Sequence, residues 1–315
     1  MNNKSLRVAL LGVGNMGRNH LRILSMLKGV EVTYIYDLQQ DRLAQLGRQY
    51  GVPYTTDLAT ALSGAEAVII ATPTSTHCEL FEYCAPLVRF AFIEKPVAAT
   101  VEEAEKIKAL SGRYNVKVQI GFIERFNPVV SALKPMLDHE RVINIDFMRT
   151  NRLSSRISDV DVVLDLMIHD IDLALYLNGP VKSVMAFGAK EHGLVAFANA
   201  MMVHESGAMS RILASRMTEK KIRQIQVTTD SSFIDGELLR KEVIINKQSE
   251  VIQDANKPYT IASIEQQVEV KPQEALLVEL QSFIGLCTGE SDQIPDIEAG
   301  LESLQLSYRV LEQIG

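Results

Sequence analysis

The first 122 residues alternate between short apolar runs and helix-length amphipathic segments. The apolar runs are, in chain order, LRVALLG, VEVTYIYD, AVIIAT, FAFIEK and VKVQIGF. Strands of a parallel sheet are covered by helices on both faces, and they therefore read as continuous apolar runs without a polar alternation. The repeated strand and helix segments predict a Rossmann-type, doubly wound parallel sheet in residues 1–121.

The pattern changes after residue 122, where strand-like segments follow one another without helices between them. These segments are INIDFMRT, VKSVMAFGAK, LVAFANAMMVH, GAMSRILASR, IRQIQVTTD, SSFIDGE and EVIINK. Consecutive strands favour an open, mainly antiparallel sheet with helices on one face. Helices are expected at residues 162–177 and in the late segments KPQEALLVELQSFIGLCTGE and AGLESLQLSYRVLEQI. We therefore predict an α/β chain in which residues 122–315 form a second α/β domain, for substrate binding and oligomerisation.

Composition narrows the class of protein. The chain has 315 residues and a formal net charge of −7, whereas nonspecific binding of nucleic acid needs a basic face that neutralises phosphates. No stretch approaches the ~18 apolar residues of a membrane span, and the N-terminus lacks a secretory layout. Cys78, Cys84 and Cys287 show no CxxC pairing and are expected to be reduced thiols. We expect a cytoplasmic protein with no metal site and no nucleic-acid or membrane partner.

The sequence GVGNMG at residues 12–17 follows the first apolar run and opens a helical segment. In such a turn the first glycine permits the tight turn, the second lets a pyrophosphate approach the backbone, and the third lets helix and strand pack closely. Asp37 ends the second apolar run, where a carboxylate accepts the ribose hydroxyls of NAD and repels the 2′-phosphate of NADP. The expected NAD contacts are Gly12, Gly14, Asn15, Met16, Gly17 and Asp37. The alternative is a turn that serves another nucleotide or S-adenosylmethionine.

A second motif, FIEKP at residues 92–96, ends the apolar run FAFIEK. Ligands of an open parallel sheet bind outside the carboxyl ends of its strands, so Lys95 is expected to point into the cofactor crevice. Pro96 biases Lys95 to an extended conformation and allows a cis peptide bond between the two residues. The alternative is that Lys95 is a solvated residue at the end of a strand.

Four titratable side chains lie in the otherwise apolar stretch VVLDLMIHDIDLALYL, residues 162–177. Asp165, His169, Asp172 and Tyr176 are spaced by 4, 3 and 4 residues, which puts them on one narrow stripe of a helix. An imidazole such as that of His169 accepts a proton near neutral pH, so the stripe combines acid and base groups. The alternative is a core pair of Asp165 and His169 without chemistry.

Five motifs, in chain order, resemble the Gfo/Idh/MocA family of oxidoreductases. They are GVGNMG, ATPTSTH at 71–77, EKP at 94–96, GFIERFNP at 121–128 and DLMIHDIDLALYL at 165–177. The resemblance implies a Rossmann domain followed by an α/β domain, and hydride transfer between nicotinamide and a sugar or cyclitol. It implies that the catalytic residues are Lys95, Asp165 and His169. The further cofactor contacts that it implies are Thr72, Pro73, Thr74, His77, Glu94 and Lys95.

The segments GFIERFNP and RTNRLSSRISDVDVVLDLMIHDID are similar to the subgroup that oxidises C3 of UDP-N-acetylglucosamine or its uronic acid, for a following aminotransferase. Arginines in these segments offer bidentate contacts to a diphosphate, and solvated loop arginines are the alternative. No extra basic residue for a sugar carboxylate is evident, which favours UDP-N-acetylglucosamine. The expected substrate contacts are Lys95, Arg125, Asn127, Arg152, Arg156, Asp165, His169 and Asp172, with Arg149 as a further candidate.

Two other interpretations stay open: an inositol or free-sugar dehydrogenase, and a non-catalytic scaffold that senses NAD. A scaffold would have no need for Lys95, Asp165 and His169 together. The alternating apolar pattern of residues 181–245 predicts a sheet face that is covered in a homodimer or homotetramer.

Overall fold

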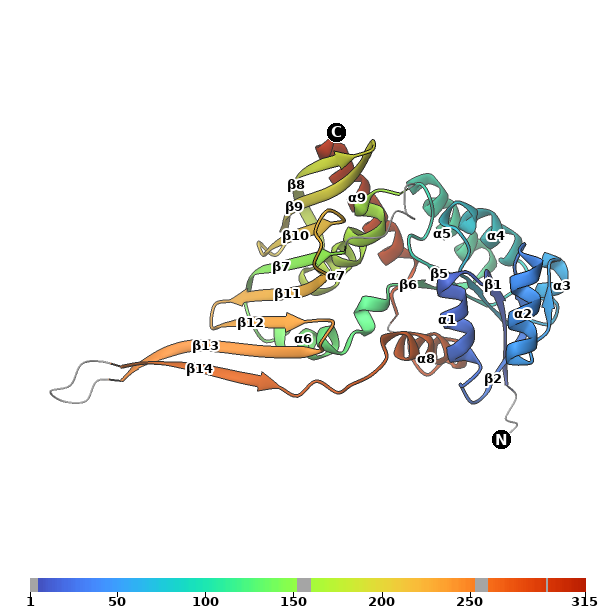
Figure 1. The fold of residues 1–315 in the computed structure, drawn as a ribbon, viewed down its shortest axis with the longest axis horizontal. Coiled ribbons are helices and arrows are strands. Elements are labelled where there is room, and N and C mark those ends of the chain that lie inside the picture. The colour runs from blue at the N-terminus through green and yellow to red at the C-terminus, as the bar shows by residue number, and fades with distance from the viewer. Residues whose placement is uncertain (1–4, 152–159, 253–259, 293) are drawn as a thin grey trace. The chain divides into compact units, whose positions relative to one another are not determined.

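The chain forms two compact units (Figure 1). The structure, a computed structural model, describes residues 5–151, 160–252, 260–292 and 294–315. The first unit contains residues 1–123 and 274–305, and the second contains residues 124–273 and 306–315. The first boundary lies within a few residues of the predicted one at 121. Residues 274–305, in contrast, pack with the first unit, although the sequence analysis placed them in the second domain.

The first unit is built on a six-stranded parallel sheet in the order β3-β2-β1-β4-β5-β6. Its strands are β1 (Leu6–Leu11), β2 (Val30–Tyr36), β3 (Tyr54–Thr55), β4 (Ala67–Ile70), β5 (Phe90–Glu94) and β6 (Lys117–Gly121). Its helices are α1 (Asn15–Leu24), α2 (Gln40–Tyr50), α3 (Leu58–Leu62), the 3-10 turn η1 (Thr74–Thr76), α4 (His77–Cys84), α5 (Val101–Tyr114) and α8 (Ala275–Thr288). This strand order is that of the Rossmann fold, and it confirms the predicted fold class of this part.

The core of the first unit explains why α8 belongs to it. Every residue of β4 and β5 is buried, as expected for parallel strands covered on both faces. Leu276, Leu280 and Phe283 of α8 belong to the same buried cluster as Leu10 and Phe92 of the sheet. The rings of Phe283 and Phe92 meet edge to face, with centroids 5.7 Å apart. The apolar face of α8 therefore completes this core.

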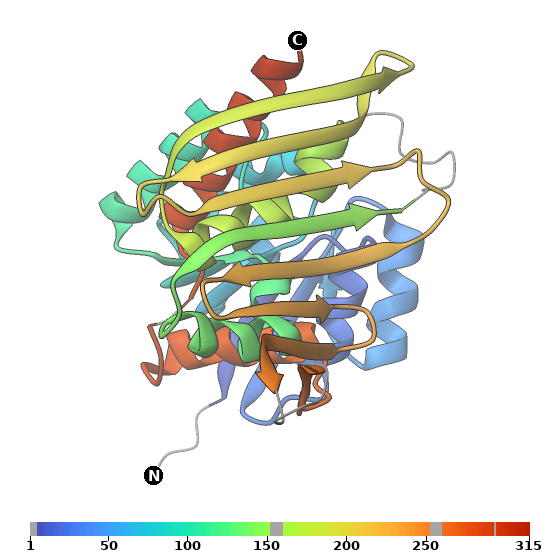
Figure 2. The same ribbon diagram turned by 90° about the vertical axis from the view of Figure 1, so that its left-hand side faces the viewer.

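The second unit is built on an eight-stranded sheet in the order β14-β13-β12-β11-β7-β10-β9-β8, with β7 and β10 as its parallel pair (Figure 2). Its strands are β7 (Val142–Thr150), β8 (Val181–Glu191), β9 (Leu194–His204), β10 (Met209–Ser215), β11 (Ile222–Thr229), β12 (Ser232–Glu237), β13 (Glu242–Ile252) and β14 (Thr260–Val268). Its helical segments are the 3-10 turn η2 (Ile123–Phe126), α6 (Pro128–Leu137), the π-helical turn η3 (Val163–Met167) and α7 (Ile168–Asn178). Helix α9 (Ile297–Ile314) is shared, because it belongs to the first unit up to Gln305 and to the second unit from Leu306. The open, mainly antiparallel sheet confirms the prediction.

The two faces of this sheet differ in character. Along β9, Ala198, Ala200 and Met202 are fully buried in the core that the helices share with the sheet, while Met201 between them is 45% exposed. The outward face is mixed. Its exposed apolar side chains include Met185, Phe187 and Met201, and its polar side chains include Asn199, Asp146, Arg211, Gln224 and Gln226. In the described part of the chain, no helix covers this outward face (Figure 2).

Two expectations from composition concern cysteines and membranes. Cys78 and Cys84 are buried and Cys287 is partly buried, and all three are free thiols. Burial raises the pKa of Cys84 to about 12, so this side chain packs as a small apolar group. Within the described ranges, no helix combines the length and the apolar character that crossing a membrane requires.

Candidate active site

The three glycines of GVGNMG are needed for different reasons. Gly12 has a φ of +90°, and a Cβ there would lie 2.6 Å from the carbonyl oxygen of Ala71. A Cβ at Gly17 would lie 1.9 Å from the carbonyl oxygen of Gly12, so the fold itself requires glycine at both positions. A Cβ at Gly14 would meet nothing within 4 Å in the described part of the protein. The space beside Gly14 is therefore suited to a ligand that approaches the backbone closely.

Helix α1 begins at this space, with Gly14 as its N-cap. No side chain caps the helix, and its first turn contains no acidic residue. The first N–H groups of a helix have no intrahelical partner and form the positive end of the helix dipole. The backbone N–H groups of Asn15, Met16 and Gly17 are thus suited to the pyrophosphate of a dinucleotide.

Asp37 follows β2 and lies half-buried beside the glycine turn. Its Oδ2 accepts a hydrogen bond from the N–H of Val13 at 2.9 Å, and its Oδ1 accepts one from the N–H of Gln39 at 2.8 Å. A carboxylate oxygen accepts more than one hydrogen bond, so acceptor capacity is left for ribose hydroxyls. Asp37 therefore holds the glycine turn in place, a task that the sequence did not indicate, and also fits the predicted cofactor contact.

The turn after β4 lies at the same edge of the sheet, because β4 is the parallel neighbour of β1. Thr72, Pro73 and Thr74 are at least partly exposed there. The hydroxyl of Thr76 donates to Oγ1 of Thr72 at 2.8 Å, which fixes the turn. These residues fit the predicted role of a cofactor-contacting turn.

His77, also predicted to contact the cofactor, is 1% exposed. Its Nδ1 lies 3.0 Å from the carbonyl oxygen of Pro96, and its Nε2 lies 3.0 Å from that of Thr72. Burial lowers the pKa of His77, so the neutral ring donates its one N–H to one of these two oxygens. His77 thus links the turn after β4 to the turn after β5, and both of its nitrogens already face the backbone.

Lys95 follows β5 at this same carboxyl edge, because β5 pairs with β4. It is half-buried, and its peptide bond to Pro96 is cis, as the sequence allowed. The neighbouring Glu94 is buried, and its carboxylate lies 2.6 Å from a ring nitrogen of His20. The edge of the first sheet therefore brings together the glycine turn, the Thr72 turn and a lysine.

In the second unit, the predicted helix over 162–177 is the π-helical turn η3 followed by α7. Asp165 lies in the π-helical turn and His169 in the first turn of α7. Single π-helical turns are frequent at functional sites. Asp165 and His169 are partly buried, Asp172 is 1% exposed and Tyr176 is 36% exposed. The predicted stripe therefore passes through the core at Asp172 and reaches the surface again at Tyr176.

Every aspartate in residues 161–172 is bound by a partner from another element. The pairs are Asp161 with the N–H of Val195, Asp165 with Arg216, Asp170 with Arg149, and Asp172 with Arg125. The pairs Asp170–Arg149 and Asp172–Arg125 are bidentate, with distances between 2.6 and 2.9 Å. These bonds anchor the segment that carries Asp165 and His169 to strands and turns on several sides.

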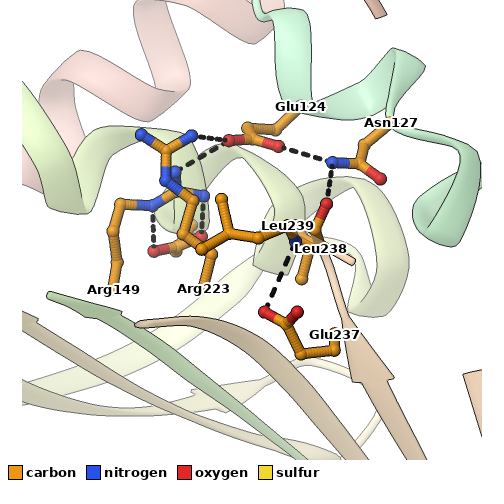
Figure 3. Close-up of polar contacts among 8 residues, drawn as sticks. Glu124, Asn127, Arg149, Arg223, Glu237, Leu238 and Leu239 are labelled. Atoms are coloured by element: carbon orange, nitrogen blue, oxygen red, sulfur yellow. Dashed lines mark hydrogen bonds and ion pairs between the residues drawn. The ribbon is translucent and has the colours of Figure 1, made fainter. Parts of the chain in front are cut away.

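A buried charge network surrounds Arg149 (Figure 3). Besides Asp170, Arg149 binds Glu124 at 2.8 Å, and the same Glu124 oxygen accepts a hydrogen bond from Arg223 at 3.0 Å. Burial opposes the charge of Arg149, but the carboxylates of Asp170 and Glu124 outweigh it and raise the pKa of Arg149. Burial likewise opposes the charge of Glu124, and the two arginines keep the pKa of Glu124 below its usual value. The ion pairs therefore favour the charged forms of Arg149 and Glu124, whereas burial raises the pKa of Asp170 and lowers that of Arg223.

The structure changes the interpretation of several predicted substrate contacts. Arg149 is 1% exposed, and its pairing leaves it unsuited to a diphosphate. Arg125 binds Asp172 and stacks on the ring of Tyr176 at 4.7 Å. The amide of Asn127 caps α6 at Val129 and donates to Glu124 and to the carbonyl oxygen of Leu238. These side chains therefore hold the second unit together, and their contact with the substrate stays a prediction. Arg152 and Arg156 lie outside the described residues.

Several residues of these two sites were not singled out from the sequence. They are His20, Glu124, Asp170, Arg216 and Arg223. A signal was available for His20, because it shares a buried helical stripe with Gly17, Leu21 and Leu24, and a histidine in such a stripe needs a polar partner. No local pattern pointed to the others, whose partners lie far away in the sequence.

The carboxyl edge of the first sheet has the features of a dinucleotide-binding site. Residues 6–122 match the oxidoreductase family described as having an NAD-binding Rossmann fold, and residues 141–233 match the GFO/IDH/MocA C-terminal domain. The chain belongs to the GFO/IDH/MocA family of oxidoreductases. It is an NAD-dependent dehydrogenase, and the open space at Gly14, the α1 N-terminus and Asp37 would hold the cofactor.

Similar proteins match along nearly the whole chain. The UDP-N-acetylglucosamine 3-dehydrogenase of Acidithiobacillus ferrooxidans is 26% identical over 312 residues, covering 97% of this chain and 96% of that protein. The scyllo-inositol 2-dehydrogenase (NAD(+)) of Bacillus subtilis is 26% identical over 320 residues, covering 93% and 90%. A solved structure of the Acidithiobacillus ferrooxidans enzyme covers 98% of both chains with a TM-score of 0.89 and 24% identity.

Gly14→Ala is expected to separate NAD binding from folding. Gly14 has an extended backbone with negative φ, and an added Cβ meets nothing within 4 Å among the described residues, so the loss of this N-cap glycine should lower the melting temperature by only about 2–4 °C. The added methyl group occupies the space of the pyrophosphate, and the Kd for NAD, measured by calorimetry, should rise about tenfold or more. The matched control is Gly17→Ala, which should destabilise the fold itself. Unchanged NAD affinity in Gly14→Ala would contradict the placement of the pyrophosphate.

Proposed function

We propose that the protein oxidises a secondary hydroxyl of a nucleotide sugar, C3 of UDP-N-acetylglucosamine, to the 3-keto sugar with reduction of NAD. The observation that carries the reaction class is the half-buried Lys95 at the sheet edge that carries the glycine turn. The substrate is supported by similarity to a UDP-N-acetylglucosamine 3-dehydrogenase over 97% of the chain. A similar match to a scyllo-inositol dehydrogenase makes a cyclitol the second candidate.

In the proposed reaction, the substrate carbon loses a hydride and its hydroxyl loses a proton. Bound NAD supplies the hydride acceptor at its nicotinamide ring. His169 accepts the hydroxyl proton as a general base. Lys95 donates a hydrogen bond to the same oxygen and stabilises its developing negative charge. Asp165, which Arg216 holds at 2.9 Å, orients a neighbouring substrate hydroxyl or the imidazole.

We propose that Arg152 and Arg156 bind the diphosphate of the substrate. Support comes from their place in the chain, between β7 and the η3 turn that carries Asp165. The other arginines near this segment are engaged by Asp165, Asp170 and Asp172. A guanidinium binds phosphate oxygens in a bidentate manner.

A substrate panel tests the proposal. NADH formation is followed by absorbance with UDP-N-acetylglucosamine, its uronic acid, scyllo-inositol, myo-inositol and glucose. Turnover with UDP-N-acetylglucosamine, and a rise of its KM in the double variant Arg152→Ala/Arg156→Ala, is the expected result. Turnover with an inositol and with no other compound of the panel would show that the substrate is a cyclitol and not a nucleotide sugar. NAD binding without turnover on any substrate would favour the non-catalytic scaffold.

We also propose a homodimer or homotetramer in which the outward face of the eight-stranded sheet is covered. The exposed side chains of Met185, Phe187 and Met201 on β8 and β9 support it. Light scattering at micromolar concentration should give at least twice the mass of the chain, and a monomer there would contradict the proposal. A following aminotransferase is the partner that a 3-keto product calls for.

A further inference from the structure

Glu94 of the EKP motif is turned into the first unit. It is 7% exposed, and its Oε1 lies 2.6 Å from Nε2 of His20. Its Oε2 accepts a hydrogen bond from the N–H of Lys95 at 3.3 Å. A Cβ at Gly121, on the neighbouring strand β6, would lie 2.9 Å from that Oε2. The glycine therefore leaves room for the carboxylate at this place.

His20 is the buried partner of this carboxylate. It lies on α1 with 0% exposure, and its ring meets that of Phe92 edge to face at 5.1 Å. Among the described residues, its Nδ1 has no hydrogen-bond partner. The arrangement therefore favours the tautomer that carries its proton on Nε2 and donates it to Glu94. Helix α1 is the same helix whose N-terminus receives the cofactor.

A buried carboxylate costs free energy unless it is hydrogen-bonded and paired, and a buried polar pair is weak support for stability alone. An apolar pair would fill the same space without this cost. We therefore expect the His20–Glu94 pair to fix the geometry of the residues around it. His77 holds the other side of the motif, at the carbonyl oxygen of Pro96, so two buried imidazoles flank the lysine.

We propose that His20 is a positioning residue for Lys95. Through Glu94 it fixes the peptide from which Lys95 projects, and it connects this lysine to helix α1. A cofactor seated on the N-terminus of α1 and the reacting lysine then share one rigid support. The inference rests on the proposed function of Lys95, and it adds a residue that the chemistry itself does not touch.

Three substitutions of His20 separate geometry from packing. The side-chain amide nitrogen of glutamine reaches the position of Nε2, whereas that of asparagine corresponds to Nδ1, and leucine offers no donor. His20→Gln therefore keeps the donor to Glu94, while His20→Asn and His20→Leu lose it. Glu94→Gln removes the charge from the other partner. Asn19→Ala, at an exposed position next in the helix, is the control.

The first readout is turnover of the full-length enzyme with the substrate that the panel identifies. His20→Leu and His20→Asn are expected to lower kcat about 10- to 100-fold, the effect of a reacting group displaced by about 1 Å. The KM for NAD should stay within about twofold, and His20→Gln should recover most of kcat. Asn19→Ala should match the parent enzyme. The double variant His20→Leu/Glu94→Gln should lose no more than the stronger single variant, because the two residues act as one unit.

The second readout needs no substrate. The rate at which acetic anhydride modifies Lys95 is measured against pH by mass spectrometry, with the exposed Lys106 as internal reference. The groups that surround Glu94 and contribute to this profile are His20, His77 and Lys95. Glu94→Gln removes a negative charge beside Lys95 and should lower the midpoint of the Lys95 profile. His20→Leu leaves that charge without its donor and should move the midpoint away from the parent value without this fall, and His20→Gln should leave it in place.

The outcomes distinguish this inference from the proposed function. Normal turnover in Lys95→Ala would contradict the catalytic role proposed for Lys95. Loss of turnover in Lys95→Ala, combined with a parent-like kcat and Lys95 profile in His20→Leu, would overturn the positioning role alone. Equal losses of kcat, NAD affinity and melting temperature in all three His20 variants would assign His20 to packing and overturn it as well.

Discussion

Lys95→Ala is expected to lower kcat about 10²- to 10⁴-fold, the usual contribution of a positioned acid or base group. Lys95 is half-buried; its amine is the donor that we assign to the reacting oxygen, and alanine leaves the developing charge without it. The Kd for NAD should change little, because the glycine turn, the α1 N-terminus and Asp37 hold the rest of the cofactor. NADH absorbance gives the first quantity and calorimetry the second.

Lys106→Ala is the matched control for this experiment. Lys106 lies on α5 of the same unit, is half exposed and pairs with Glu82, so its loss should leave turnover unchanged. His169→Ala should show a fall in kcat comparable to that of Lys95→Ala, because we propose that both residues act on the same hydroxyl. Normal turnover in either variant would refute the catalytic assignment.

Arg149→Met is expected to lower the free energy of unfolding by about 3–5 kcal/mol, the cost of removing one partner from a buried ion pair. Methionine fills much of the volume, but it leaves the carboxylates of Asp170 and Glu124 in the core without their principal cation. Urea unfolding followed by circular dichroism measures the loss. Because the chain has two units, the transitions of both must be fitted separately.

Arg211→Met provides the contrast. Arg211 lies on β10, the strand next to that of Arg149, but it is half exposed on the outward face and pairs with Asp146 at 2.8 Å. An exposed ion pair contributes about 0–1 kcal/mol, so this variant should unfold almost as the parent does. Equal losses in the two variants would contradict burial as the cause.

Most of the fold could be predicted because its signals are local. The seven strand-like segments after residue 122 appear as β7 to β13, and the helix over 162–177 appears within one residue at each end. Helix α6 was not predicted, because Pro135 lies inside it and reads as a helix breaker. The membership of α8 in the first unit was not predicted either. An apolar helix face indicates that the helix packs in a hydrophobic core. The position of the helix in the sequence does not indicate which of the two cores it joins.

The candidate site divides in the same way. The glycine turn was predictable because only glycine fits where the backbone is approached closely, by the fold itself at Gly12 and Gly17 and by the expected ligand at Gly14. The internal pairing of Arg125 and Arg149 could not be predicted, because the partner of a guanidinium is decided by the tertiary fold. Asp172 and Arg125 are 47 positions apart in the sequence, and Glu124 and Arg223 are 99 apart. A segment rich in Arg and Asp is compatible with phosphate binding or with internal pairing, and for Arg125 and Arg149 the structure shows pairing.

Helix α8 packs in the first unit but follows the second unit in the sequence, so it is synthesised long after the sheet that it covers. The ribosome makes the six parallel strands first, then the 150 residues of the second unit, 124–273, and only afterwards α8. Until then, the apolar surface around Leu10 and Phe92 that α8 covers faces water. The first sheet of the nascent chain thus lacks its covering helix α8 while the second unit is being synthesised. A cofactor-binding fragment that folds alone should therefore join residues 1–123 to 274–305.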